Sequence, residues 1–125
     1  IILDESFVKV GQFPLSEGEP SLWILNIRVS KMGGLLRACT VAARAKAAGI
    51  PIVVGAQVGE TSILTRVALV VADRYRDILI AQEGAVGTHL LEYDLCEPPL
   101  MFGRGGCLAD TVFYGRSGLG LSFAR

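Results

Sequence analysis

The sequence predicts an α/β fold, because short apolar strands alternate with helical patterns along most of the chain. The clearest example is residues 22–34, LWILNIRVSKMGG, in which an apolar stretch ends at a glycine pair. An alanine-rich helical pattern follows at once, and this strand, turn and helix make one βα unit. A strand that is apolar on both faces is typical of a buried parallel sheet. Repeated units of this kind form either half of an eight-stranded barrel or one small open sheet.

The expected strands and helices are bounded by glycine, by proline or by a change of periodicity. We expect the strands, the first of them buried, at Ile1–Leu3, Ile24–Val29, Ile52–Val54 and Asp77–Ala81. We expect the helices at Leu35–Ala48 and from Thr61 or Ser62, either of which can cap it, to about Tyr75. At most a helical turn or two fits within Phe7–Ser21, which is rich in helix breakers.

The spacing of apolar residues also predicts which side of each helix is buried. In the first helix these positions are Leu35, Ala38, Val41, Ala42 and Ala45. In the second helix they are Ile63, Val67, Val70 and Val71. After Thr88, glycines and prolines divide the chain into short apolar pieces, so we expect a loop-rich tail with room for a hairpin near Thr111–Tyr114.

Composition narrows the classes of partner. Basic and acidic residues number 12 each, so no basic field indicates nucleic acid, and no apolar run is long enough to cross a membrane. The cysteines at positions 39, 96 and 107 are too few and too scattered for a disulfide framework, which favours a reducing, cytoplasmic setting. Because the chain opens inside an expected strand without a methionine, we expect a processed chain or the carboxyl part of a longer protein.

Charged and polar residues stand where each expected strand ends. They are Asp4 with Glu5, then Arg28, the loop from Gln57 to Glu60, and Glu83. The carboxyl ends of parallel strands gather at one rim, where α/β proteins place their chemistry. Carboxylates and a cation meeting there suit a hard divalent cation and a carboxylate ligand. We therefore take Asp4, Arg28, Gln57, Glu60 and Glu83 together as candidate residues for binding a substrate and a metal ion.

Each acid also has a purely structural interpretation, which the sequence leaves open. Asp4 and Glu5 suit the start of a helix, and Glu60 suits the first turn of the helix that follows it. Glu83 fits a solvated loop acid. The pair Gly33-Gly34 is better explained by a tight strand-to-helix turn than by phosphate binding.

The order of these segments resembles the enolase superfamily, in its muconate-lactonizing-enzyme-like branch. Three pieces carry the resemblance over nearly the whole chain: the DES run at Asp4–Ser6, the segment NIRVSKMGG around Arg28, and the terminal SGLGL at Ser117–Leu121. It implies the carboxyl-terminal half of a TIM-type (β/α) barrel. Residues 1–88 would supply strands five to eight with their helices, and residues 89–125 a tail that packs back toward a capping domain.

The resemblance also implies an activity. Members are Mg²⁺-dependent lyases and isomerases that abstract a proton α to a carboxylate and stabilise an enediolate, in cycloisomerase, elimination or epimerase reactions. Asp4 matches a metal ligand, with Glu5 a further candidate, Arg28 stands where lysine is usual, and Glu60 resembles a catalytic acid near the substrate. The other metal ligands and the base lie upstream in this family. We therefore expect the chain to be inactive alone, to need the missing amino-terminal half, and to form a homo-oligomer.

Arg28 suits a fixed cation better than a general base. Deprotonation at pH 7 costs about 9 kcal/mol for arginine, against roughly 4–5 kcal/mol for lysine. Three residues further on, Lys31 would point to the opposite face of a regular strand, so we do not expect it to replace the base. A reaction with one base is favoured. The alternatives are a non-catalytic α/β module that binds an anion or a partner, and a degenerate fragment.

Overall fold

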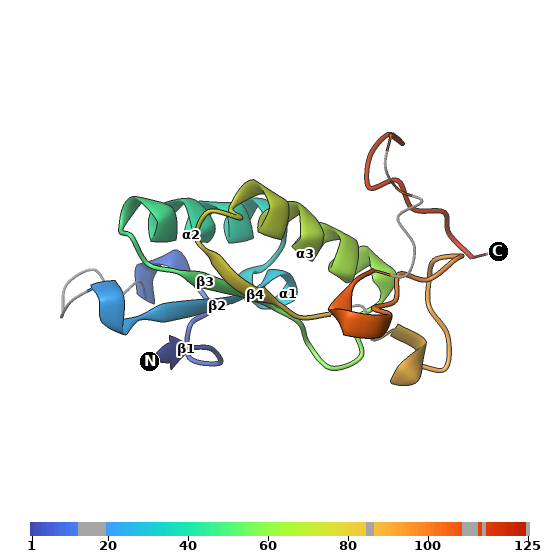
Figure 1. The fold of residues 1–125 in the computed structure, drawn as a ribbon, viewed down its shortest axis with the longest axis horizontal. Helices are drawn as coiled ribbons and strands as arrows, with labels where there is room; N and C mark the ends of the chain where they lie inside the picture. Colours follow the sequence, from blue (N-terminus) through green and yellow to red (C-terminus); the bar gives the residue numbers. More distant parts are fainter. Residues whose placement is uncertain (13–19, 85–86, 109–112, 114, 125) are drawn as a thin grey trace.

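The computed structural model describes residues 1–12, 20–84, 87–108, 113 and 115–124. In this part of the chain one parallel sheet has its strands in chain order, β1 (Ile2–Leu3), β2 (Ile24–Arg28), β3 (Ile52–Gly55) and β4 (Leu79–Gln82). Helix α2 (Leu35–Ala47) connects β2 to β3 and helix α3 (Ser62–Arg74) connects β3 to β4, and both lie on the same side of the sheet (Figure 1). The predicted α/β architecture is confirmed.

The end of β2 differs from its prediction. Val29, expected in the strand, begins the single helical turn α1 (Val29–Met32). Gly33 and Gly34 then adopt φ values of 81° and 112°, which side chains rarely tolerate, and the chain turns into α2. The glycine pair therefore serves the turn, as expected. The fourth strand begins at Leu79 rather than Asp77, because Tyr75 to Ile78 form the turn that leaves α3.

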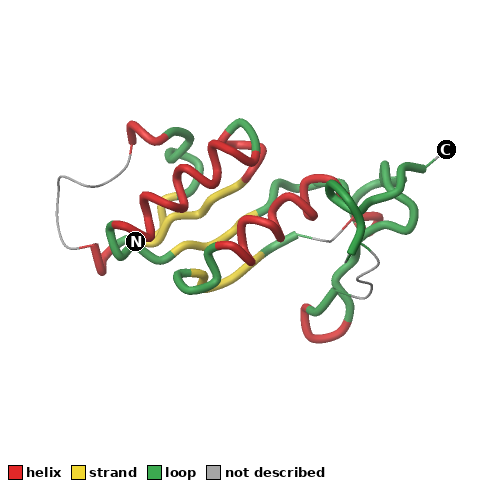
Figure 2. The backbone as a smooth tube through the Cα atoms, turned by 90° about the horizontal axis from the view of Figure 1, so that it is seen from above, coloured by secondary structure: helices red, strands yellow, loops and turns green. Residues whose placement is uncertain are grey.

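The core lies between the sheet and the two long helices. Leu25, Ile27, Ile52 and Val54 are fully buried on the covered face of the sheet. The face of α2 that contacts them is the predicted one, with Ala38, Val41, Ala42 and Ala45 buried and Leu35 at its margin. Figure 2, seen from the side of the helices, shows the two long helices lying over the strands.

The predicted face of α3 is confirmed at Val71 and in part at Val67, which packs partly buried against the core, but the other buried positions were not predicted. The buried residues are Ser62, Thr65, Ala68, Val71 and Ala72, whereas Ile63, Val67 and Val70 are only partly buried. The spacing of apolar residues cannot predict that Ser62 is buried, because this polar residue is buried through hydrogen bonds with distant residues of the tail.

The second face of the sheet is not covered by α2 or α3. Ile24 and Val53 are partly exposed there, and Ala81 is exposed. The prediction that Ile1–Leu3 is buried is also wrong for Ile1 and Ile2, which are 72% and 59% exposed, whereas Leu3 is partly buried against the core. Their strand is an edge of the sheet, so it has a neighbour on one side only.

The remaining described segments carry short 3₁₀ turns at Val10–Gln12, Pro20–Leu22, Gly87–His89 and Arg104–Gly106. Within Phe7–Ser21 the described residues carry the turn at Val10–Gln12 and the start of the turn at Pro20–Leu22, and the prediction for residues 13–19 lies outside the described residues. The tail has isolated antiparallel bridges between Cys96 and Phe123 and between Phe102 and Leu108. The hairpin considered near Thr111–Tyr114 lies outside the described residues apart from Phe113. Among the described helices, none has the length and apolar character needed to cross a membrane.

Candidate functional site

Three of the predicted rim residues meet at the carboxyl ends of the strands. Arg28 is the last residue of β2, and its guanidinium lies between the chain after β1 and the loop after β3. Nη2 donates to Oδ2 of Asp4, and Nη1 donates to Oε1 of Gln57 at 3.1 Å. Glu5 is a weaker partner, since its exposed carboxylate lies 3.5 Å from Nη2. The register of a parallel sheet thus explains how residues far apart in sequence come together.

Asn26 belongs to this cluster, although its role was not predicted. It stands two residues before Arg28 and therefore points to the same face of β2. Its side-chain amide donates to Oδ2 of Asp4 at 2.9 Å, and the residue is buried. The available signal was a polar residue inside an otherwise apolar strand, in phase with the arginine.

Lys31 also joins the cluster, which corrects the expectation that it points away. Its ammonium lies 2.8 Å from Oδ1 of Asp4 and 2.6 Å from the backbone oxygen of the same residue. The expectation assumed a regular strand, whereas α1 turns the chain by helical geometry directly after Arg28. A helical turn places the third residue after Arg28 back near it, where an extended strand would not.

Asp4 is consequently a carboxylate with cations on both oxygens. Burial raises the pKa of Asp4, but the hydrogen bond and charge of Lys31, the charge of Arg28 and the amide of Asn26 outweigh it. The pKa of Asp4 therefore lies below its ordinary value, and the carboxylate is ionised at neutral pH.

Glu60 reaches the cluster through Gln57. It is buried, and its Oε1 accepts hydrogen bonds from the backbone nitrogen of Gln57 at 2.9 Å and from the hydroxyl of Ser30 at 3.3 Å. It precedes α3, whose first turn contains no acidic residue, so the interpretation as a first-turn acid is wrong. Its carboxylate shapes the loop that presents Gln57 to Arg28.

Glu83 stands apart from these residues. It follows β4 at the same rim, but its side chain is exposed and accepts a hydrogen bond from the backbone nitrogen of Ala56 at 3.2 Å. The rim residues therefore follow the predicted order of the strands. Arg28 contacts both Asp4 and Gln57, whereas Glu83 lies beyond the loop after β3.

The described residues do not by themselves fit a metal ion. A carboxylate is a suitable ligand for Mg²⁺, but both oxygens of Asp4 already accept from Lys31, Arg28 and Asn26. Within the described ranges no group of three or more His, Cys, Asp or Glu side chains could hold a metal. Asp4 would supply one ligand at most, and only after losing a cation.

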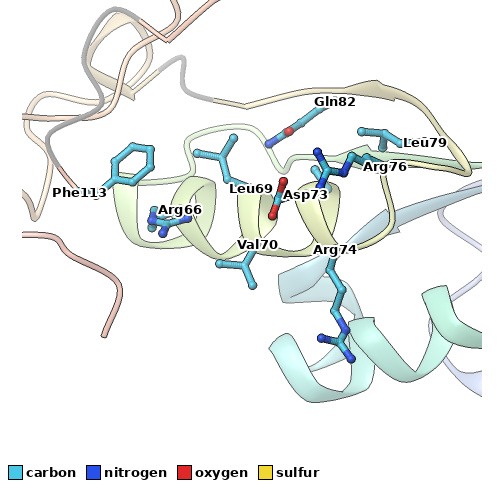
Figure 3. A pocket seen from close by; sticks show the side chains of 10 residues that line it. Arg66, Leu69, Val70, Asp73, Arg74, Arg76, Leu79, Gln82 and Phe113 are labelled. Carbon is cyan, nitrogen blue, oxygen red and sulfur yellow. The ribbon is translucent and has the colours of Figure 1, made fainter. Parts of the chain in front are cut away.

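A cavity lies elsewhere, between α3 and β4. It has a volume of about 570 Å³ and is lined by Arg66, Leu69, Val70, Ala72, Asp73, Arg74, Arg76, Leu79, Gln82 and Phe113 (Figure 3). None of these residues belongs to the rim cluster. Arg66 lies over the ring of Phe113 and donates to the backbone oxygen of Leu119 at 3.0 Å, so this side of α3 is linked to the tail.

The parallel sheet, the helices on one of its faces and the polar rim define an α/β domain with charged residues at the carboxyl ends of its strands. A family model described as "Enolase C-terminal domain-like" matches residues 1–125, and the chain belongs to that family. Neither a curated protein nor a solved structure matches the chain at a significant level.

Proposed function

We propose that the chain is the carboxyl-terminal part of an enolase-superfamily lyase or isomerase that abstracts a proton α to a carboxylate. The observation that supports this most strongly is the continuous cluster in which Arg28 joins Asp4 after β1 to Gln57 after β3. Such a cluster at the carboxyl ends of parallel strands is the place where barrel enzymes bind their substrates. Family membership supports the superfamily, and the reaction class is part of the proposal.

In this proposal Arg28 is a fixed cation for the substrate. Its side chain is 17% exposed, so it is mostly shielded from water while one side remains accessible. A guanidinium in such a place stabilises the negative charge that develops on an enediolate. Gln57 orients the guanidinium, Glu60 holds the loop that carries Gln57, and Glu83 contributes at the outer side of the rim.

The proposal requires residues that the described chain does not provide. Mg²⁺ belongs to it through the family, and Asp4 would be one ligand, with Glu5 beside it. The remaining ligands and the base would come from an amino-terminal half of the same protein. Residues 1–88 would then be one part of a barrel, and residues 89–125 a tail that packs toward a capping domain. A homo-oligomer is also part of the proposal.

Hydrogen exchange tests this proposal. The complete protein with Mg²⁺ is incubated in D₂O with a panel of small carboxylates, and deuterium at the α carbon is followed by NMR. We expect exchange on one face, reduced by about 10²–10³-fold in Arg28→Met and partly retained in Arg28→Lys, because the charge survives there. Arg44→Met, an exposed change on α2, serves as the control. Exchange on both faces would contradict a single base.

A second candidate is a non-catalytic module that binds an anion or a partner. It is favoured by the pairing of both Asp4 oxygens with cations, which leaves neither oxygen of that carboxylate free for a metal. A degenerate fragment is the third candidate. Calorimetry with MgCl₂ and with a small carboxylate separates them: the enzyme binds both, the anion-binding module binds only the carboxylate, and the fragment binds neither.

A further inference from the structure

The cavity between α3 and β4 contains a buried amide group without a partner. Gln82 is the last residue of β4, and its Nε2 is shielded from water and has no hydrogen-bond partner among the described residues. Gln82 pairs with Val54, which is buried on the face of the sheet that the helices cover. Its side chain therefore lies on the side of α3, where an unpaired donor destabilises the protein unless an acceptor reaches it.

An irregularity in β4 explains why this polar side chain lies in the cavity. The strand contains an extra residue, Ile80, between the partners of Ile52 and Val53. In a regular strand Leu79 and Gln82, three residues apart, would point to opposite faces of the sheet. The extra residue brings both side chains to the same face, and both line the cavity.

Two arginines bring positive charge to this cavity. Arg66 lies near Phe113, with its guanidinium carbon 4.2 Å from the centre of the ring, and its Nε donates to the backbone oxygen of Leu119 at 3.0 Å. These contacts hold its guanidinium in place. Figure 3 shows the guanidinium of Arg76 directed toward Gln82, whereas that of Arg74 points away from the other lining side chains.

The remaining lining residues limit the charge and the character of a ligand. Among the described residues that line the cavity, Asp73 is the one acid, and its carboxylate offsets one of the two cations. Leu69, Val70 and Leu79 supply apolar surface. The volume of about 570 Å³ lies in the range of small-molecule sites. A ligand that matches these features has one negative charge and an apolar body.

We propose that this cavity binds a small organic monocarboxylate, whose oxygens accept hydrogen bonds from Nε2 of Gln82 and from the guanidinium of Arg76. Amide and guanidinium N–H groups both suit carboxylate oxygens. The apolar body of the ligand packs against Leu69 and Leu79. A phosphate dianion is a poorer match, because its second charge faces Asp73 and it has no apolar part. The cavity is separate from the rim cluster, so this inference does not rest on the proposed function.

Calorimetry of the complete protein with sodium benzoate tests this proposal. Benzamide has nearly the same shape without the charge, and inorganic phosphate has charge without the apolar body. We expect benzoate to bind, benzamide to bind at least about tenfold more weakly, and phosphate not to bind measurably. Binding of benzoate to the cavity should remain in Arg28→Met, which removes the guanidinium of the rim.

Substitutions in the lining give a second measurement. We expect Gln82→Leu and Arg76→Met to lower the affinity for benzoate at least about tenfold, because each removes a donor to the carboxylate. Asp73→Asn should raise the affinity severalfold, since it removes a repelling charge. Arg74→Met is the matched control and should bind benzoate as the native protein does, because its guanidinium points away from the cavity (Figure 3).

Thermal unfolding without ligand separates loss of binding from loss of structure. Gln82→Leu removes an unpaired buried amide and keeps a side chain of similar size, so its Tm should equal or exceed that of the native protein. A lower affinity for benzoate in that variant is then due to the missing donor.

Three results would overturn the proposal. If binding persists in Gln82→Leu and disappears in Arg28→Met, benzoate binds at the rim, and the proposed function is unaffected. If benzamide or phosphate binds as tightly as benzoate, the class of ligand is wrong. If benzoate does not bind to the complete protein, the cavity is not a carboxylate site.

Discussion

Among single residues, Asn26 and Gly55 together fix the geometry of the rim. Asn26 is 5% exposed, donates to Asp4, and its side chain lies against Gly55, which pairs with Arg28 across the two strands. A β carbon built on Gly55 would lie 2.2 Å from Oδ1 of Asn26. Glycine at this position therefore provides space for a side chain, rather than an unusual backbone conformation.

We expect Gly55→Ala to lower the free energy of unfolding by about 1–3 kcal/mol, because the added methyl group forces Asn26 away from Asp4. Urea denaturation measures this change. Gly11→Ala is the control, since its β carbon would meet nothing within 4 Å. In the double variant Asn26→Ala/Gly55→Ala the clash is absent, so the two effects should not add. Equal stability of the Gly55 and Gly11 variants would refute the steric explanation.

Cys96 provides a prediction about pH. Burial of the thiol, and then the charge of Asp94, raise the pKa of Cys96. The folded protein thus retains the thiol proton at a pH where the unfolded chain, with a thiol pKa of about 8.5, has lost it. The contribution of Cys96 to the free energy of unfolding is therefore fully present below that pH. It is lost as the pH rises toward the folded-state pKa of the thiol.

The measurement compares unfolding free energies at about pH 8 and about pH 10. We expect Cys96→Ala to lose less stability over this interval than the native protein, while Cys107→Ala, which removes an exposed thiol, behaves as the native protein does. The same loss in all three proteins would show that Cys96 does not cause it.

Among the elements, α3 depends on the tail for its amino-terminal cap. Thr61 occupies the cap position but makes no side-chain capping hydrogen bond. Instead Oδ2 of Asp94 accepts from the backbone nitrogen of Ser62 at 2.8 Å and from its hydroxyl at 2.9 Å. The same hydroxyl accepts from the backbone nitrogen of Leu100 at 2.7 Å. The prediction of Thr61 or Ser62 as a cap identified the right end of the helix and missed the acceptor.

We expect Asp94→Ala to lower the free energy of unfolding by about 2–3 kcal/mol, since it leaves buried donors unpaired at a helix terminus. Asp73→Ala, an exposed change on the same helix, should have little effect. Hydrogen exchange adds a local measurement, because the amide of Ser62 should lose protection only in the first variant. If both variants were equally stable, the tail would not support α3.

The buried face of an element could be predicted where it follows from the local spacing of apolar residues. It could not be predicted where burial depends on contacts with residues far along the chain. The strands and α2 follow from apolar runs, and the rim order of Asp4, Arg28 and Gln57 follows from parallel topology. The predicted direction of the Lys31 side chain was wrong because the helical turn α1 begins at Val29, which was expected to be the last residue of the strand. The buried face of α3 was misplaced because Ser62 is satisfied by Asp94, which lies far along the chain.

At the scale of the whole molecule, the described chain leaves apolar surface and strand edges uncovered. Strands β1 and β4 are the edges of the sheet, and the face opposite α2 and α3 carries Ile24 and Val53 only partly buried. The cavity of about 570 Å³ opens beside β4 as well. In a closed barrel the edges pair with further strands and the inner face is filled by layers of side chains.

The central claim is that these residues form part of a barrel that other residues complete, and size-exclusion chromatography with light scattering on purified residues 1–125 tests it most directly. Because unpaired edges and an open apolar face promote association, we expect aggregates or a dimer that closes the sheet. Addition of the amino-terminal half should restore a soluble species that binds Mg²⁺. A monomer that is stable over days and unfolds cooperatively would contradict the claim, and the chain would then be a small domain in its own right.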